Sequence, residues 1–129
     1  MHLADTIKYD AHGLVPVAVT DHKSNRLLVI CFLNREALEK TLETGLVYVY
    51  RRSKGRVMLK GETSGHVEHV REVRVNCGND SLEIRVEQKV AACHEGYLSC
   101  FYRVWDERSG DWRVVDERLF DPKRVYKEP

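Results

Sequence analysis

Three cysteines and one histidine are the residues of this 129-residue chain best suited to chemistry. Cys77 follows a stretch of alternating apolar residues, and Cys93 and Cys100 flank a short polar segment. Three thiolates form a soft, negatively charged ligand set that suits Zn²⁺. Three protein ligands leave the fourth tetrahedral position open, as in catalytic zinc sites. We therefore expect Cys77, Cys93 and Cys100 to bind zinc in a hydrolase.

His94 follows the second of these cysteines directly. The imidazole side chain changes its protonation near neutral pH, so His94 is suited to carry a proton during catalysis. A catalytic zinc ion lowers the pKa of water and so supplies a nucleophile in the same pH range. The pattern indicates metal-assisted hydrolysis.

The cysteines also have a plainer interpretation. Free cysteine is among the most buried residue types and often packs as a small apolar side chain. The chain contains no pair of cysteines with the CxxC spacing. The spacing alone therefore leaves both interpretations open for Cys77, Cys93 and Cys100. We expect Cys31, which lies inside an apolar run, to belong to the core.

The composition fits one folded domain that spans residues 1–129. Hydrophobic residues make up 43% of the chain and charged residues 32%, with a net charge of +1. This balance gives no reason to expect a nucleic acid or a membrane as partner. The chain start does not read as a secretory signal. We expect a cytoplasmic protein whose cysteines are reduced.

The elements that must position these residues are mostly strands. Alternation and apolar runs predict strands at residues 14–20, 27–33, 46–52, 56–59, 73–77, 82–86, 101–105 and 112–115. We expect the continuous apolar run 27–33 to be buried on both faces. Cys77 is expected at the end of its strand, on the apolar side.

One clear helix is predicted over Arg35–Thr44. Asn34 is suited to cap its first turn, and Gly45 is suited to end it. The expected fold class is therefore α+β: a sheet-dominated single domain with one main helix.

Several separate stretches resemble the phosphoribosyl-AMP cyclohydrolase family. They are residues 34–38 (NREAL), 41–45 (TLETG), 60–66 (KGETSGH), 92–94 (ACH) and 99–103 (SCFYR). The resemblance runs from about residue 14 to residue 103, in order and with natural spacing. It strengthens the prediction of a zinc site.

The resemblance implies a reaction and an assembly. The family hydrolyses the N1–C6 bond of the adenine ring in N1-(5-phosphoribosyl)-AMP, in histidine biosynthesis, and it is homodimeric. On its pattern, Cys77 comes from one protomer and Cys93 with Cys100 from the other. His94 matches the family's candidate general base.

The resemblance also implies where the nucleotide-like substrate binds. The candidates are Arg52, Ser53, Lys60, Gly61, Glu62, Thr63, Ser64, Gly65 and His66. Glycines in the 60–66 loop would let backbone N–H groups approach a phosphate or a base closely.

The sequence departs from the family around Cys77. The family carries Asp-Cys-Asp-x-Asp there, and its three aspartates bind Mg²⁺. This chain has Asn76, Gly78 and Asp80 at the three positions, so Asp80 is the one acid that remains. Because Mg²⁺ prefers charged oxygen ligands, we expect the site formed by Asn76 and Asp80 to be weak or missing.

Two other functions stay open at this point. The chain could be a divergent paralogue, a zinc hydrolase of the same fold that acts on a different nucleotide or heterocycle. It could also be a non-catalytic zinc-binding protein. The sequence does not assign a role to the charged tail after Asp116.

Overall fold

A four-stranded sheet forms the centre of the computed structural model, which describes residues 2–62, 65–88 and 96–119. Its strand order is β2-β1-β6-β5. The bounds are β1 Leu14–Asp21, β2 Leu27–Asn34, β5 Glu68–Val75 and β6 Leu82–Gln88. β1 and β6 are parallel, whereas the β1–β2 and β5–β6 pairs are antiparallel. The two predicted hairpins of this sheet are confirmed.

Helix α1, Arg35–Thr44, has the predicted bounds and the predicted caps. The side chain of Asn34 accepts a hydrogen bond from the backbone N–H of Ala37 at 2.8 Å. Gly45 adopts a left-handed conformation, with φ 75°, and its N–H donates to the carbonyl of Thr41. Both ends of the helix are therefore satisfied as expected from these residue types. A short 3-10 helix, η1 at Leu3–Thr6, lies beside α1.

The core lies between the sheet and α1. Residues that alternate along β1 and β6 are fully buried, among them Val15, Val17, Ile84 and Val86. From the helix, Leu38 packs into the same cluster. Each large aliphatic side chain buried in this way contributes roughly 1.5–3 kcal/mol to folding. Leu82, at the start of β6, belongs to the same core.

A second, two-stranded sheet packs beside β2 and α1. It consists of β3 Tyr48–Arg51 and β4 Arg56–Leu59, which pair antiparallel as predicted. The hydroxyl of Thr41 on α1 accepts a hydrogen bond from the N–H of Tyr48 at 2.9 Å. β4 leads directly into the loop at residues 60–66.

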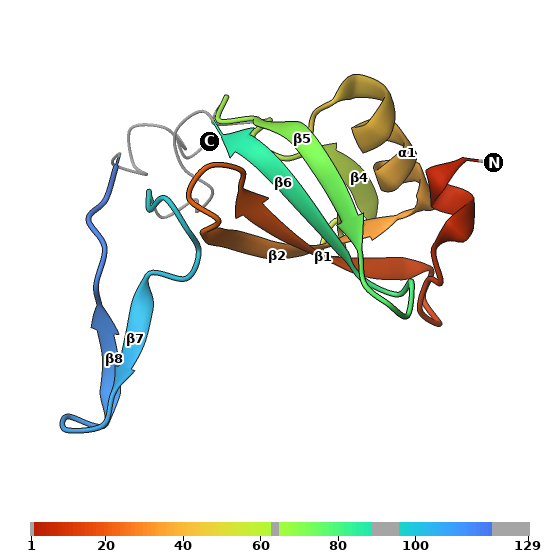
Figure 1. Ribbon diagram of the computed structural model, residues 1–129. Coiled ribbons are helices and arrows are strands. Elements are labelled where there is room, and N and C mark those ends of the chain that lie inside the picture. The colour runs from red at the N-terminus through yellow and green to blue at the C-terminus, as the bar shows by residue number, and fades with distance from the viewer. Residues whose placement is uncertain (1, 63–64, 89–95, 120–129) are drawn as a thin grey trace.

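The last hairpin projects away from the rest of the molecule (Figure 1). It comprises β7 Arg103–Asp106 and β8 Asp111–Val114, which confirms the predicted hairpin. We call residues 101–115 the arm. Trp105 and Trp112 pack edge to face on it, with ring centroids 5.4 Å apart, yet both are about half exposed.

The prediction that β2 is buried on both faces is wrong. β2 is an edge strand of the sheet, and the side chain of Ile30 is 51% exposed. A continuous apolar run cannot distinguish an interior strand from an edge strand with one uncovered face.

Among the described residues, no helix is long and apolar enough to cross a membrane.

Candidate functional site

Cys77 lies in the turn that joins β5 to β6. We call residues 76–80 the cysteine turn. β5 ends at Val75, two residues earlier than predicted, and Cys77 is exposed. The prediction that Cys77 lies on the apolar side of a strand is therefore wrong, because the alternation stops before it. Its thiol is free and accessible.

Hydrogen bonds within the cysteine turn fix its shape. The side-chain oxygen of Asn76 accepts from the N–H groups of Asp80 and Ser81, at 2.9 and 3.1 Å. The side-chain amide of Asn76 donates to a carboxylate oxygen of Asp80 at 2.6 Å. Asn79 adopts a left-handed conformation with φ 58°, and its carbonyl accepts from the N–H of Lys8. The carboxylate of Asp80 is thus already engaged by a neutral side chain.

Cys100 belongs to a segment that is fastened to β2. We call residues 96–100 the anchored segment. The N–H of Cys100 donates to the carbonyl of Leu28 at 2.7 Å. Ser99 is fully buried, and its hydroxyl donates to the carbonyl of Leu27 at 2.7 Å. On the other side, Gln88 donates through its amide to the carbonyl of Leu98 at 2.9 Å.

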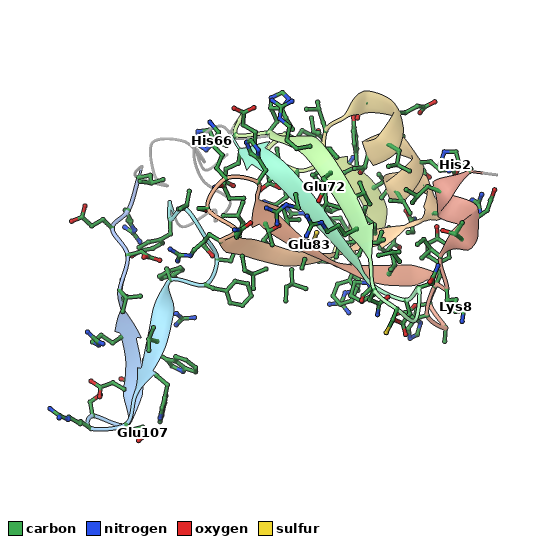
Figure 2. All side chains as sticks on the ribbon, in the orientation of Figure 1. His2, Lys8, His66, Glu72, Glu83 and Glu107 are labelled. Carbon is green, nitrogen blue, oxygen red and sulfur yellow. The ribbon has the colours of Figure 1, made fainter. Side chains whose placement is uncertain are left out.

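The cysteine turn and the anchored segment lie at opposite ends of the four-stranded sheet. The cysteine turn precedes the first residue of β6, whereas the anchored segment bonds to Gln88, the last residue of β6. Six residue steps of about 3.3 Å make β6 roughly 20 Å long. In Figure 2, Lys8 marks the first end, because it bonds to the cysteine turn, and His66 lies at the other end.

This separation has a direct consequence for a metal ion. Two sulfurs bound to one tetrahedral zinc ion lie roughly 4 Å apart, since each Zn–S bond is about 2.3 Å. Within one copy, Cys77 and Cys100 do not meet that condition. No group of three His, Cys, Asp or Glu side chains in the described part of the chain is placed to hold a metal.

The two described ends of the 60–66 loop approach each other closely. Gly61 has φ 88°, and a β-carbon there would lie 2.5 Å from the carbonyl oxygen of His66. The N–H of Gly65 donates to the carbonyl of Gly61 at 2.7 Å. At its start, the N–H of Lys60 bonds to Val47. Gly61 is therefore required by a close backbone approach, which supports the prediction of special loop geometry.

Arg52 and Ser53 lie at the opposite end of the β3–β4 hairpin from this loop. They lie in the β3–β4 turn, whereas Lys60 follows the far end of β4. The guanidinium of Arg52 stacks over the ring of Phe32, 4.4 Å from its centroid. The β3–β4 hairpin therefore separates the predicted substrate residues into two groups.

Some predicted site residues lie outside the described residues. They are Thr63, Ser64, Cys93 and His94. Cys31, by contrast, packs against the core as predicted. Burial raises the pKa of its thiol to about 12. In the metal-free chain, Cys31 is therefore a neutral thiol at neutral pH.

The sequence analysis missed two features, one in the anchored segment and one on the arm. Ser99 is a buried anchor, and a serine between two site residues carries no signal of that role. The exposed aromatic pair on the arm did carry a signal. Apolar residues cluster on both strands of a hairpin for which no covering element was predicted, among them Val104, Trp105, Trp112 and Val114.

Comparison with known proteins now adds to this geometry. Residues 29–102 match the family model described as phosphoribosyl-AMP cyclohydrolase. A phosphoribosyl-AMP cyclohydrolase of Pelotomaculum thermopropionicum is 50% identical over 95% of this chain and 94% of its own length. One from Methanosarcina acetivorans is 48% identical, over 95% and 97%. One from Rhodopseudomonas palustris is 49% identical, over 92% and 82%. The chain belongs to the phosphoribosyl-AMP cyclohydrolase family.

Proposed function

We propose that this chain is a zinc-dependent cyclohydrolase that opens the adenine ring of N1-(5-phosphoribosyl)-AMP, a step of histidine biosynthesis. One observation carries the proposal: a relative named for this activity is 50% identical over nearly the whole of both chains. The chain is accordingly a hydrolase that acts on a cyclic amidine. A non-catalytic zinc protein is not favoured.

The reaction sets the tasks of the site. Water adds to C6 of the ring, and the N1–C6 bond breaks. The water oxygen stays on C6 as the carbonyl of a carboxamide, and N1 takes up a proton. The enzyme must therefore activate water, move protons and hold the nucleotide still.

Cys77, Cys93 and Cys100 are the proposed zinc ligands. Cys77 is exposed, so a metal can reach it. When bound, zinc supplies water activation near neutral pH. His94 is proposed as the general base that takes up and returns the proton. Reduced cysteines of this kind are expected in the cytoplasm.

A homodimer accounts for the separation of the two cysteines. If the cysteine turn of one copy lies against the anchored segment of another, Cys77 and Cys100 reach one metal ion without any change of fold. A closed pair of this kind contains two identical sites. Each site is then incomplete without the partner copy.

The arm supplies a second argument for the dimer. A two-stranded hairpin alone is at best marginally stable in water, and large exposed apolar patches mark interaction surfaces. The exposed apolar side chains of this region are Phe101, Val104, Trp105, Trp112, Val114 and Val115. The arm begins directly after Cys100, so a partner that covers it also approaches the zinc ligand.

The proposed enzyme works without a tight magnesium site in the cysteine turn. The side-chain amide of Asn76 donates to the carboxylate of Asp80, and Gly78 has no side chain to offer. One carboxylate holds Mg²⁺ weakly unless substrate phosphates complete its shell.

The loop at residues 60–66 is proposed to bind the substrate. Gly61 lies against the backbone of His66, and the N–H of Gly65 bonds to the carbonyl of Gly61, so the described ends of the loop are held together. Arg52 and Ser53 lie at the other end of the β3–β4 hairpin and are proposed to contact another part of the substrate.

The test is turnover of N1-(5-phosphoribosyl)-AMP by the purified protein, and the quantity measured is the rate of ring opening. Zinc-loaded protein is compared with chelator-treated protein and with chelated protein given back zinc alone. We expect activity to be lost on chelation and restored by zinc without added magnesium. A zinc-loaded protein that leaves this substrate intact but hydrolyses another ring would identify the chain as a paralogue.

A further inference from the structure

Three buried oxygen atoms lack a hydrogen-bond donor in the part of the chain that the structure describes. Two are the carboxyl oxygens of Glu68, a residue with no exposed surface. The third is the side-chain carbonyl oxygen of Gln88. A buried polar atom without a partner costs about 1–3 kcal/mol, and an ionised one costs more. Neither residue has a role in the proposed chemistry described above.

These two residues lie side by side at the end of the sheet that carries the anchored segment. Glu68 is the first residue of β5, Gln88 is the last residue of β6, and the two are direct cross-strand partners. Leu82, Ile84 and Val86 alternate on the buried face of β6, and Gln88 continues their phase. Cross-strand partners project from the same face of a sheet. Both side chains therefore point into the protein.

The amide orientation of Gln88 is fixed by its other contact. Its nitrogen donates to the backbone carbonyl of Leu98 at 2.9 Å. A backbone carbonyl can only accept, so the nitrogen must face Leu98 and the oxygen must face away. That oxygen is left without a donor among the described residues, and Glu68 is the cross-strand neighbour of Gln88.

A protonated Glu68 carboxyl meets this need. An ionised carboxylate only accepts, and two acceptors side by side cannot bond. Burial raises the pKa of Glu68, and the positive charge of Lys60 opposes the shift less strongly. The nearby Cys31 on β2 stays a neutral thiol. His66, half-buried, is two residues earlier in the chain.

We propose that Glu68 retains its proton in the folded enzyme and donates it to the side-chain oxygen of Gln88, which positions Cys100. The bonded amide of Gln88 holds Leu98, and Leu98 lies two residues before Cys100. Glu68 is a positioning residue, since it acts through Gln88. The link to Cys100 as a zinc ligand rests on the proposed function, whereas the retained proton does not.

The retained proton has a defined effect on stability. In the unfolded chain a glutamate ionises near pH 4.3. In the folded chain the proton stays bound to a higher pH, so the folded state binds more protons between the two pKa values. Stability therefore falls as pH rises through this window, by up to tenfold in the folding equilibrium constant per pH unit.

The matched variant is Glu68→Gln, which keeps the shape and the donor but cannot ionise. Urea unfolding of the zinc-loaded full chain is measured from pH 4 to pH 9 for the native protein and this variant. We expect the native protein to lose stability relative to Glu68→Gln as pH rises. Glu43→Gln, at an exposed position of α1, serves as control and is expected to follow the native curve. Parallel curves for native protein and Glu68→Gln would overturn the proposal.

Two further readouts keep the proposal testable if a variant folds poorly. Infrared spectra of the native protein at neutral pH should contain the carbonyl stretch of a protonated carboxyl group; its absence would overturn the retained proton. For the positioning role, Glu68→Gln should keep native kcat and zinc content, whereas Glu68→Leu should lose both at least tenfold. Native zinc content and kcat in a folded Glu68→Leu protein would refute the positioning role.

Discussion

Each end of the four-stranded sheet carries a cysteine that is a proposed zinc ligand, but the two ends hold their cysteines in different ways. The cysteine turn is held by hydrogen bonds among its own residues, and Cys77 within it is exposed. The anchored segment is fastened on two sides, to β2 through Ser99 and to β6 through Gln88. The cysteine turn is thus a preformed element that keeps its shape by itself, whereas the anchored segment is fastened to the sheet.

This difference teaches how a shared site can be assembled. The anchored segment bonds to Gln88, and the 60–66 loop leads into β5 beside Glu68, the cross-strand partner of Gln88, so both lie at one end of the sheet. The cysteine turn needs only to keep its shape until a partner meets it. The chemistry is expected at the anchored end, and the cysteine turn completes the metal site.

The largest expected effect is on the rate, at the anchored end. His94→Ala should lower kcat roughly 10²- to 10⁴-fold, because it removes the proposed general base. Zinc content should stay unchanged, since His94 is not a proposed ligand. His69→Ala is a matched control at an exposed position of β5 and should leave both quantities unchanged. A fully active His94→Ala enzyme would remove His94 from the mechanism.

The second expected effect is on assembly. Replacing Trp105 and Trp112 by serine should weaken the dimer by about 2 kcal/mol or more for each buried aromatic anchor. Zinc should be lost along with the dimer, because the two ends no longer meet. Light scattering and metal analysis measure the two losses together, and Arg108→Ser at the exposed tip is the control. A monomer that still binds zinc would show that the two ends of the sheet do not need to meet across a dimer.

The third expected effect is on the 60–66 loop. Gly61→Ala places a β-carbon 2.5 Å from a backbone oxygen, at a positive φ, and should destabilise the loop by about 3 kcal/mol. Gly55→Ala has a similar φ of 63° but open space, so about 1 kcal/mol is expected. Thermal unfolding and KM measure the contrast. Equal losses in the two variants would mean that the loop is not closed around Gly61.

The smallest expected effect concerns magnesium in the cysteine turn. A β-carbon at position 78 would lie 3.2 Å from a carboxylate oxygen of Asp80, so Gly78→Asp brings two acids together. With Asn76→Asp, the double variant should be about 1 kcal/mol less stable without Mg²⁺ and should recover with it. Calorimetric titration with Mg²⁺ compares it with the native chain. Tight binding of Mg²⁺ by the native chain alone would contradict the expected weak site.

Local features were predicted well from the sequence. Asn34 and Gly45 determine the ends of α1 through their own backbone and capping chemistry, so no distant residue was needed. The hairpins followed from alternation between polar turns. Cys31 was placed in the core because its neighbours are apolar on both sides.

Features that depend on strand order could not be predicted in this way. The exposure of Ile30 follows from the edge position of β2, which an apolar run does not specify. The distance between Cys77 and Cys100 follows from the direction of β6. The pairing of Glu68 with Gln88 requires the β5–β6 register, and the alternation in β5 gave no reason to single out an acid at its first position.

The most direct test of the shared site mixes two inactive proteins. Cys77→Ser and Cys100→Ser are purified separately, and each is expected to lack zinc and activity. After subunit exchange, about half of the dimers are hybrids, and each hybrid has one site with both cysteines intact. The mixture should therefore regain roughly a quarter of native zinc content and activity. A mixture that regains neither, although exchange is verified, would contradict a zinc site shared between two copies.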